Sequence, residues 1–327
     1  MQQTRPADEI VVVNDSSTDK TLDVLKKYEK NIIIVTTPKN TGNKSYAQEY
    51  GLQFVTGDVF ITTDGDTILD SDFIKIIEQE MQNDHIAAVA GYVKSLRRNW
   101  ITACRALDYT VSQNIDKLAQ DYLNFIFVIP GAAGAFRTDI FKNKINFDHD
   151  TLTEDLDFTY RLHEIRHKIK FNRNAICYTQ DPTTLKSYIN QMRRWFGGGW
   201  QNLNKHFKVP NSPGMALELS LIYVEGLVYS MLMFVLPLIN LYLTMWLLLA
   251  YFFIILGLAI FSSIKERRLD ILFCVPEYIF LKYVNAWIFA EQFFYEIILK
   301  KKSLVWFKPS RWEANIPVAP VKTSEKI

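Results

Sequence analysis

Ile61-Thr62-Thr63-Asp64-Gly65-Asp66 ends an apolar run that begins at Val59, and it closes with two carboxylates separated by one glycine. Residues i and i+2 of an extended segment point the same way, so Asp64 and Asp66 can converge at the end of a strand. Two clustered carboxylates repel each other unless a cation lies between them, and Mg²⁺ is held by such carboxylates together with phosphate oxygens and water. The stretch therefore indicates a metal–diphosphate site, although Asp-Gly is also a common turn dipeptide.

Short β-branched runs alternate with helical patterns around this stretch. Strands are expected at residues 9–13, 32–35 and 58–63, and helices at about 45–54 and 71–81. This order predicts an α/β fold with a parallel, doubly wound sheet, in which ligands bind at the carboxyl ends of the strands. Asp15 follows the first strand, so we expect it to lie close to Asp64 and Asp66.

The composition is that of a protein with a membrane part. Hydrophobic residues make up 49% of the chain and aromatic residues 14%, which is high for a soluble protein. The formal net charge of +2 argues for no particular partner, and we expect no nucleic acid to bind. The three cysteines are far apart and show no metal-type spacing, so reduced, cytosol-facing thiols are expected.

The middle of the chain is less regular. A strand is expected at 87–93 and a long helix at 99–120, followed by the small-residue stretch Ile129–Arg137. Small residues let a backbone approach a ligand closely. This stretch either forms the floor of a substrate cleft or is only a tight turn into a strand.

A helix is expected directly after Thr153-Glu154-Asp155. Thr153 is a plausible N-cap, and the two acids lie in the first turn, where the helix dipole favours negative charge. This capping role can coexist with a chemical one. The same helix carries His163 and His167 in the H-E-x-x-H order of zinc proteases. We reject a zinc site, because the helix has an apolar face and no third ligand stands at a recognisable spacing.

Gln191, Arg194 and Trp195 share one face of a helix expected within residues 183–205. Arginine can bind a phosphate with two hydrogen bonds, and an indole can stack on a sugar ring. The alternative is an amphipathic helix on a membrane surface, which explains the tryptophans but gives no reason for Gln191.

The stretch Gly226–Ser263 has no charged residue. As one helix it would be about 57 Å long, roughly twice the ~30 Å hydrocarbon core of a bilayer. We expect it to break near Pro237–Asn240 into two antiparallel spans, at about 217–236 and 241–262. The basic residues at 265–268 fit the positive-inside rule and return the chain to the cytosol.

The segment from 271 to 299 is apolar but carries several charges, so it is a third span, a re-entrant hairpin or an interfacial helix. The positive-inside rule favours no net crossing. The expected organisation is a cytosolic domain at 1–212, a membrane region at 213–312 and a disordered tail at 313–327.

Five motifs, in order, give the chain a resemblance to the processive family 2 glycosyltransferases, namely cellulose, chitin, hyaluronan and poly-N-acetylglucosamine synthases. The resemblance runs from about residue 3 to about residue 312. The motifs are Val-Val-Asn14-Asp15-Ser-Ser-Thr-Asp19, Asn40-x-Gly42-x-Lys44, Asp64-Gly-Asp66, Thr153-Glu154-Asp155 and Gln191-x-x-Arg194-Trp195.

The resemblance implies a GT-A-like fold and a set of roles. Asp15 is expected to hold the uracil and Lys44 to lie near the nucleotide. Asp64 and Asp66 are expected to contact the UDP and its Mg²⁺ or Mn²⁺, with Asp66 as the metal ligand. Asp155 is expected to be the general base. The residues expected to border the diphosphate and the acceptor sugar are Glu154, Gln191, Arg194 and Trp195.

The implied activity is an inverting transfer of N-acetylglucosamine or glucose from a UDP-sugar to a growing β-linked polysaccharide. The sequence from Thr183 to Gln191 looks closest to the poly-N-acetylglucosamine branch. The resemblance also implies a multi-pass protein of the cell membrane with a cytosolic catalytic domain, and export or accessory subunits as possible partners. The alternatives are a single transfer to a lipid carrier and an inactive homologue.

The chain departs from the family pattern in two places. Asn14 replaces the first acid of the usual Asp-Asp-Gly-Ser turn, and Ser16 replaces its glycine. The family also normally has a strand and a helix before the position of Met1, and that strand is central in the sheet. Residues 1–327 alone are therefore expected to bind UDP weakly and to make no polymer, and an upstream extension is expected to restore both.

Overall fold

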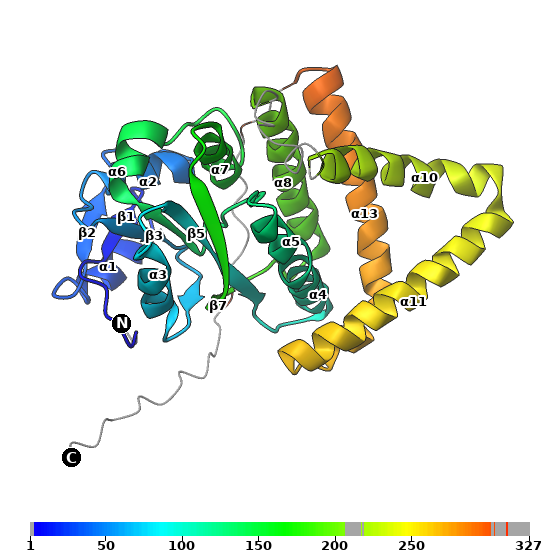
Figure 1. Ribbon diagram of the computed structural model, residues 1–327, viewed down its shortest axis with the longest axis horizontal. Helices are drawn as coiled ribbons and strands as arrows, with labels where there is room; N and C mark the ends of the chain where they lie inside the picture. Colours follow the sequence, from blue (N-terminus) through cyan, green and yellow to red (C-terminus); the bar gives the residue numbers. More distant parts are fainter. Residues whose placement is uncertain (1–2, 207–216, 218, 302–303, 305–311, 313–327) are drawn as a thin grey trace, which may run out of the picture.

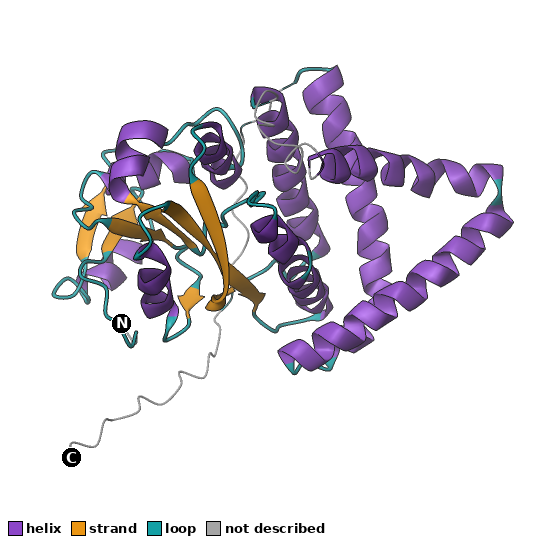
Figure 2. Ribbon diagram, in the orientation of Figure 1, coloured by secondary structure: helices purple, strands orange, loops and turns teal. Residues whose placement is uncertain are grey.

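The computed structural model describes residues 3–206, 217, 219–301, 304 and 312. Within these residues, an α/β part holds the first half of the chain and a helical part follows it (Figures 1 and 2). The strands are β1 (Val11–Asn14), β2 (Ile33–Thr36), β3 (Val59–Thr62), β4 (Ile68–Leu69), β5 (Ile86–Ser95), β6 (Gly134–Arg137) and β7 (Lys168–Thr179). The helices of the α/β part are α1 (Thr21–Lys26), α2 (Lys44–Leu52), α3 (Phe73–Met81), α6 (Thr138–Ile140), the π-helical turn η1 (Phe141–Ile145) and α7 (Glu154–Glu164).

The strands form two sheets. β1 and β2 pair in parallel, and the other strands form a mixed sheet in the order β3-β6-β5-β7-β4. β6 runs antiparallel to both β3 and β5, so that Ala135 pairs with Ile61 on one side and with Val89 on the other. The prediction of an all-parallel sheet is therefore wrong. Alternating strands and helices indicate crossover connections, but β6 follows an irregular loop, and only its tertiary pairing decides its direction.

Helices cover both faces of the mixed sheet, as in a doubly wound fold. Alternate residues of β5 point to opposite faces: Ala88 joins one buried cluster and Val89 the other. On the first face Phe158 of α7 packs against the sheet, and on the second Phe73 and Ile77 of α3 do so. Burying one such large side chain stabilises the fold by about 1.5–3 kcal/mol. The predicted α/β class is confirmed.

The helical part begins with the long predicted helix at 99–120, which is divided at Ile115. Its helices are α4 (Trp100–Asn114), α5 (Asp116–Tyr122), α8 (Leu185–Lys205), η2 (Leu221–Glu225), α10 (Gly226–Ile239), α11 (Leu241–Glu266), α12 (Asp270–Phe273), α13 (Val275–Phe293) and η3 (Phe294–Ile298). α4, α8, α11 and α13 share a buried cluster that includes Leu107, Met192, Ile255 and Leu281. This cluster packs the C-terminal helices α11 and α13 against α4 and α8.

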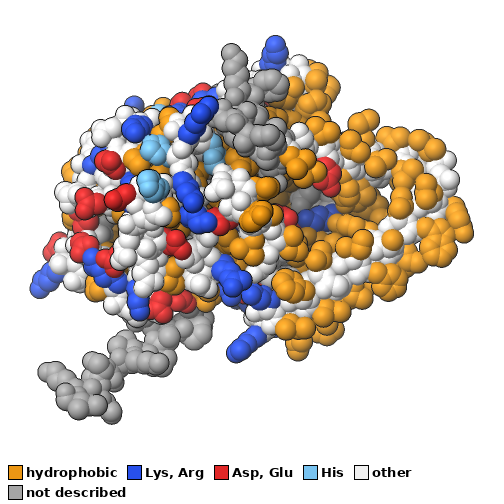
Figure 3. All heavy atoms as spheres, viewed as in Figure 1, with side chains coloured by type: hydrophobic (Ala, Val, Ile, Leu, Met, Phe, Trp, Pro, Cys, Tyr) orange, Lys and Arg blue, Asp and Glu red, His pale blue; other side chains and the backbone are white. Residues whose placement is uncertain are grey.

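η2, α10 and α11 form a hairpin that extends away from the rest of the molecule (Figure 1). The chain breaks at Asn240, whose side chain accepts a hydrogen bond from Leu243 N at 2.9 Å and caps α11. Leu221–Ile239 and Leu241–Glu266 are each long and apolar enough to cross a membrane, with mean hydropathies of 1.9 and 2.5. Figure 3 shows the hairpin covered with hydrophobic side chains.

Two charged residues of the segment 271–299 form ion pairs with the helices α4 and α8. Glu291 of α13 pairs with Arg193 of α8 at 2.8 Å, and Lys282 pairs with Asp108 of α4 at 2.9 Å. These ion pairs account for charges in an otherwise apolar segment. The predicted domain boundary at 212/213 and the predicted disordered tail at 313–327 lie outside the described residues.

Candidate active site

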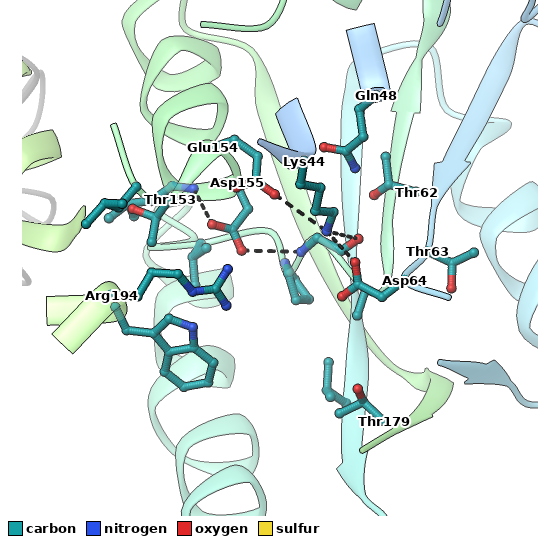
Figure 4. A pocket seen from close by; sticks show the side chains of 18 of the residues that line it. Lys44, Gln48, Thr62, Thr63, Asp64, Thr153, Glu154, Asp155, Thr179 and Arg194 are labelled. Atoms are coloured by element: carbon teal, nitrogen blue, oxygen red, sulfur yellow. Dashed lines mark hydrogen bonds and ion pairs between the residues drawn. The ribbon is translucent and has the colours of Figure 1, made fainter. Parts of the chain in front are cut away.

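A cleft of about 1650 Å³ lies at the carboxyl ends of β1 and β3 and is closed on the far side by α7 and α8. Its lining includes every residue that the sequence analysis singled out for the site: Asp15, Lys44, Asp64, Asp66, Glu154, Asp155, Gln191, Arg194 and Trp195. Segments separated by more than a hundred residues thus meet in one place. Figure 4 shows several of these side chains directed toward one another.

Asp15 lies in the loop after β1 and is held by the loop after β2. Its carboxylate accepts hydrogen bonds from Thr41 N and Thr37 Oγ1, each at 2.9 Å. Asn40 Nδ2 donates to the Asp15 carbonyl at 2.7 Å. Gly42 has a φ of 70°, in the left-handed region that favours glycine, so the turn fits the sequence there. This turn brings the chain to the start of α2.

Lys44 is the first residue of α2 and connects the strand-end loops to α7. Its Nζ lies 2.5 Å from Asp64 Oδ1 and 3.5 Å from Glu154 Oε1 (Figure 4). It also lies 3.5 Å from the carbonyl oxygen of Gly131. Burial lowers the pKa of Lys44, but the carboxylates of Asp64 and Glu154 outweigh it and hold the pKa above its usual value. Lys44 is therefore a charged group in the middle of the cleft.

Asp155 lies in the first turn of α7. Its carboxylate accepts hydrogen bonds from Leu156 N at 3.0 Å and Gly131 N at 3.4 Å. Burial and the neighbouring Glu154 carboxylate raise the pKa of Asp155 to about 6, against the opposing effect of Lys44 and Arg194. A carboxylate with a raised pKa is a stronger base than an ordinary aspartate and is still ionised at neutral pH.

Gly131 also decides between the two predicted roles of the small-residue stretch. It lines the cleft and is hydrogen-bonded to Asp155, and a Cβ at Gly131 would lie 2.8 Å from Lys44 Nζ. The stretch therefore forms part of the cleft wall, and it also leads into β6.

α8 presents Gln191, Arg194 and Trp195 to the cleft, as their shared helix face predicts. The guanidinium group of Arg194 points toward Asp155 (Figure 4). Gln191 Oε1 is buried and has no hydrogen-bond partner among the described residues. Trp195 is half-buried, and the guanidinium carbon of Arg105 lies 4.8 Å from the centre of its ring. One helix thus brings a cation, an amide and an aromatic ring to the same side of the cleft.

The sequence alone does not reveal the residues by which α8 holds the turn before Asp155. Asn202 Nδ2 donates to Thr153 Oγ1 at 3.0 Å and to its carbonyl oxygen at 3.2 Å. Gln201 Oε1 accepts a hydrogen bond from Leu152 N at 2.9 Å. A Cβ at Gly198 would lie 2.4 Å from Thr153 Oγ1. Gly198 and Asn202 are one helical turn apart, but no local pattern in the sequence pairs them with a turn 45 to 49 residues earlier.

The histidines of the H-E-x-x-H match lie outside the cleft lining. His163 is buried and its Nε2 is 2.8 Å from the carbonyl oxygen of Ile126. His167 Nε2 lies 3.4 Å from Lys144 Nζ.

The donor set at the end of β3 fits Mg²⁺ or Mn²⁺. Asp64 and Asp66 both line the cleft and offer hard oxygen ligands. In the described part of the chain, no group of three or more His, Cys, Asp or Glu side chains could hold a metal ion. The ion would therefore take its other ligands from a diphosphate and water, which is how Mg²⁺ is usually bound beside substrate phosphates.

Comparison with known proteins agrees with this arrangement. Residues 1–198 match the family described as "Glycosyltransferase like family 2". The chain belongs to glycosyltransferase family 2, which confirms the family predicted from the motifs. It is 27% identical over 206 residues to a poly-beta-1,6-N-acetyl-D-glucosamine synthase from Staphylococcus epidermidis. That alignment covers 62% of this chain and 50% of the relative, so the chain spans about half the length of the curated relatives it matches.

Solved structures share the fold. A mannosyltransferase from Pyrobaculum calidifontis, in complex with GDP-Man and Mn²⁺, aligns over 84% of this chain and 79% of its own, with a TM-score of 0.59 and 16% identity. TarS 1-349 from S. aureus, in complex with UDP-GlcNAc, aligns over 90% of this chain and 85% of its own, with a TM-score of 0.50 and 16% identity. The predicted GT-A-like fold is confirmed.

Proposed function

We propose that this chain is the catalytic part of a membrane-bound inverting glycosyltransferase. It transfers N-acetylglucosamine, or less favourably glucose, from a UDP-sugar to a growing β-linked polysaccharide. The observation that carries the proposal is the position of Asp155, a carboxylate of raised pKa in the same cleft as Lys44, Asp64 and Arg194. The cleft thus combines a base for an acceptor hydroxyl with groups suited to a diphosphate.

The donor lies on the side of the cleft formed by the strand-end loops. Asp15, held by Thr37 and Thr41, contacts the uracil. Asp64 and Asp66 hold Mg²⁺ or Mn²⁺, with Asp66 as the direct ligand. When bound, the ion neutralises charge on the diphosphate. Lys44 exchanges its contact with Asp64 for contacts with the diphosphate oxygens.

The transfer is a single displacement. Asp155 accepts the proton of an acceptor hydroxyl as that oxygen attacks the anomeric carbon, from the face opposite the UDP. The bond from this carbon to the diphosphate oxygen breaks, so an α-linked donor gives a β-linked product. Negative charge develops on the departing diphosphate, and Lys44 and Arg194 stabilise it through fixed positive charges in a partly buried site.

The acceptor lies on the side formed by α8. Trp195 stacks on a sugar ring, and Gln191 and Glu154 contact its polar groups or the diphosphate. The two apolar helices of the hairpin cross the cell membrane and keep the catalytic domain on the cytosolic side. Export or accessory subunits then take up the polymer. The names of the curated relatives support N-acetylglucosamine as the sugar.

The test is transfer by the membrane protein that carries this chain. It is purified in detergent and incubated with radiolabelled UDP-N-acetylglucosamine or UDP-glucose, Mn²⁺ and an acceptor oligosaccharide. The expected result is a labelled polymer, made from UDP-N-acetylglucosamine in preference, that β-N-acetylglucosaminidase degrades. A product with one added sugar on a lipid would favour the lipid-carrier alternative. Absence of transfer from either donor would overturn the proposal.

A further inference from the structure

Four buried or half-buried charges run in a line from α13 to the end of β7. Lys282 of α13 pairs with Asp108 of α4 at 2.9 Å, and Asp108 pairs with Arg105 at 3.0 Å. Arg105 in turn lies 3.4 Å from Asp181, which follows β7. The signs alternate along the line, so each charge has an opposite charge beside it. Tyr278 of α13 also donates to Asp108 at 2.7 Å.

Arg105 lies between two aromatic rings. Its guanidinium carbon is 4.5 Å from the centre of the Tyr109 ring and 4.8 Å from that of Trp195. Tyr109, Trp195 and Asp181 all line the cleft, whereas Arg105 lies behind them and is 4% exposed. A guanidinium group is flat and stacks on aromatic faces, so it supports the indole over its surface.

The stability of the fold does not by itself account for this row of buried charges. A buried ion pair contributes little compared with apolar side chains of the same volume, because both charges lose their hydration. Arg105 Nη2 and Asp181 Oδ2 are in addition buried without a hydrogen-bond partner among the described residues. Unsatisfied buried polar atoms are rare and call for an explanation. Support of a ring that must keep one orientation at the cleft is such an explanation.

We propose that Arg105 is a positioning residue that fixes the ring plane of Trp195 on the acceptor side of the cleft. Asp108 and Lys282 hold Arg105 from the other side, so α13 takes part in setting the acceptor site. The inference rests on the proposed function, because it takes Trp195 as the surface on which an acceptor sugar stacks. It adds the group that orients this surface.

The contacts of Arg105 predict that a change at this residue affects acceptor binding and donor binding differently. In the described part of the chain, the hydrogen bonds and ion pairs of Arg105 reach Asp108 and Asp181 and none of the donor-side residues Asp15, Lys44 and Asp64. Loss of the stacked guanidinium group should therefore weaken acceptor binding and leave donor binding unchanged.

The test compares Arg105→Lys with Arg193→Gln in the full membrane protein. Lysine keeps the charge but loses the flat stacking surface, and Arg193→Gln removes a half-exposed ion pair between α8 and α13 that does not contact Trp195. Initial rates are measured with the acceptor oligosaccharide varied and then with the UDP-sugar varied. Arg105→Lys should raise the acceptor KM about tenfold, shorten the polymer and leave the donor KM within about twofold. Arg193→Gln should match the wild type.

A double-mutant cycle shows whether Arg105 acts through Trp195. In a Trp195→Phe background, Arg105→Lys should add little to the acceptor KM, because the ring that it positions is already altered. The proposal would be overturned if the fold-change in acceptor KM of the double variant equalled the product of the two single fold-changes. Equal changes in acceptor and donor KM would overturn it too. Calorimetric binding of the oligosaccharide keeps this test independent of turnover. A protein that transfers no sugar would overturn the proposed function, whereas wild-type oligosaccharide affinity in Arg105→Lys would overturn the role of Arg105.

Discussion

The donor side of the cleft is built from loops, whereas the acceptor side is built from buried helices. Asp15 is half-buried and is held by hydrogen bonds from the loop after β2. Lys44 is half-buried as well and pairs with Asp64 in the loop after β3. Asn202 and Arg105 are almost fully buried and tie α8 to α7 and α4. Loops can adjust when a nucleotide arrives, but a base must meet its proton at a fixed distance. Substitutions on the loop side are therefore expected to change donor affinity, and substitutions on the helix side are expected to change turnover.

The largest effect is expected at Asp155. Asp155→Asn removes the proposed base but keeps the size of the side chain, so turnover should fall by about 10²-fold or more. UDP affinity should be nearly unchanged, because the residue lies on the helical side. Turnover is measured with a radiolabelled UDP-sugar, and UDP affinity by calorimetry. Polymer yield at the wild-type level would show that Asp155 is not the base.

A substitution at Asp66 tests the proposed metal site on the loop side of the cleft. Asp66→Ala removes a proposed metal ligand, so UDP affinity measured by calorimetry in the presence of Mn²⁺ should be lost. Asp58→Ala provides the control, because Asp58 is an exposed acid just before β3. Unchanged Mn²⁺-dependent affinity in Asp66→Ala would remove Asp66 from the metal site.

Gly198 tests how firmly α8 holds the turn before Asp155. In Gly198→Ala the new methyl group would overlap Thr153 Oγ1, which lies 2.4 Å from the Cβ position. The turn must shift, and turnover should fall about tenfold or more, since a misplacement of about 1 Å can cost 10²-fold. Gly257→Ala is the matched control, because a Cβ there meets nothing within 4 Å. If both variants turn over alike, the contact between α8 and Thr153 does not position the base.

The raised pKa of Asp155 predicts how turnover depends on pH. The base is active when ionised, so turnover should be half-maximal near pH 6. Below pH 6, turnover should fall about tenfold for each unit by which the pH is lowered. An ordinary aspartate would keep turnover high down to about pH 4. A rate profile at saturating substrate concentrations, over a pH range in which the protein stays folded, distinguishes the two.

The same shift makes a smaller prediction about stability. Because the pKa is higher in the folded chain than in the unfolded chain, stability falls as pH rises from about 4, and it levels off above about 6. Asp155→Asn should therefore raise the unfolding temperature relative to the wild type at pH 8, and by a smaller amount at pH 5, because the difference vanishes only below about pH 4, where the carboxyl is protonated in both states. An equal effect of Asp155→Asn at both pH values would contradict the raised pKa.

Some features of the fold and of the cleft could be predicted from the sequence, and others could not. Strand ends meet at one edge of a sheet, so Asp15 and Asp64 could be predicted as neighbours from the strand pattern. Lys44 and Asp155 were assigned to the site only by the resemblance of their motifs to a family. The hairpin was predictable from an uncharged stretch with a break at Asn240. These features depend on local sequence.

The rest depends on tertiary contacts that leave no local pattern. The direction of β6 follows from its pairing with β3 and β5. The contact between Arg105 and Trp195 joins residues that are 90 positions apart in the sequence. Asn202 and Thr153 are likewise paired only by the packing of α8 on α7. The charges of α13 were visible in the sequence, but their partners on α4 and α8 were not.

All three cysteines are reduced and buried, at positions 104, 177 and 274. A chemical probe that reacts with accessible thiols should therefore give little background labelling of the folded protein. Leu238, at the tip of the hairpin, is 86% exposed, so a cysteine introduced there would be the reactive one. Labelling of intact cells and of inverted vesicles with a reagent that does not cross membranes would then report on which side of the membrane the hairpin tip lies.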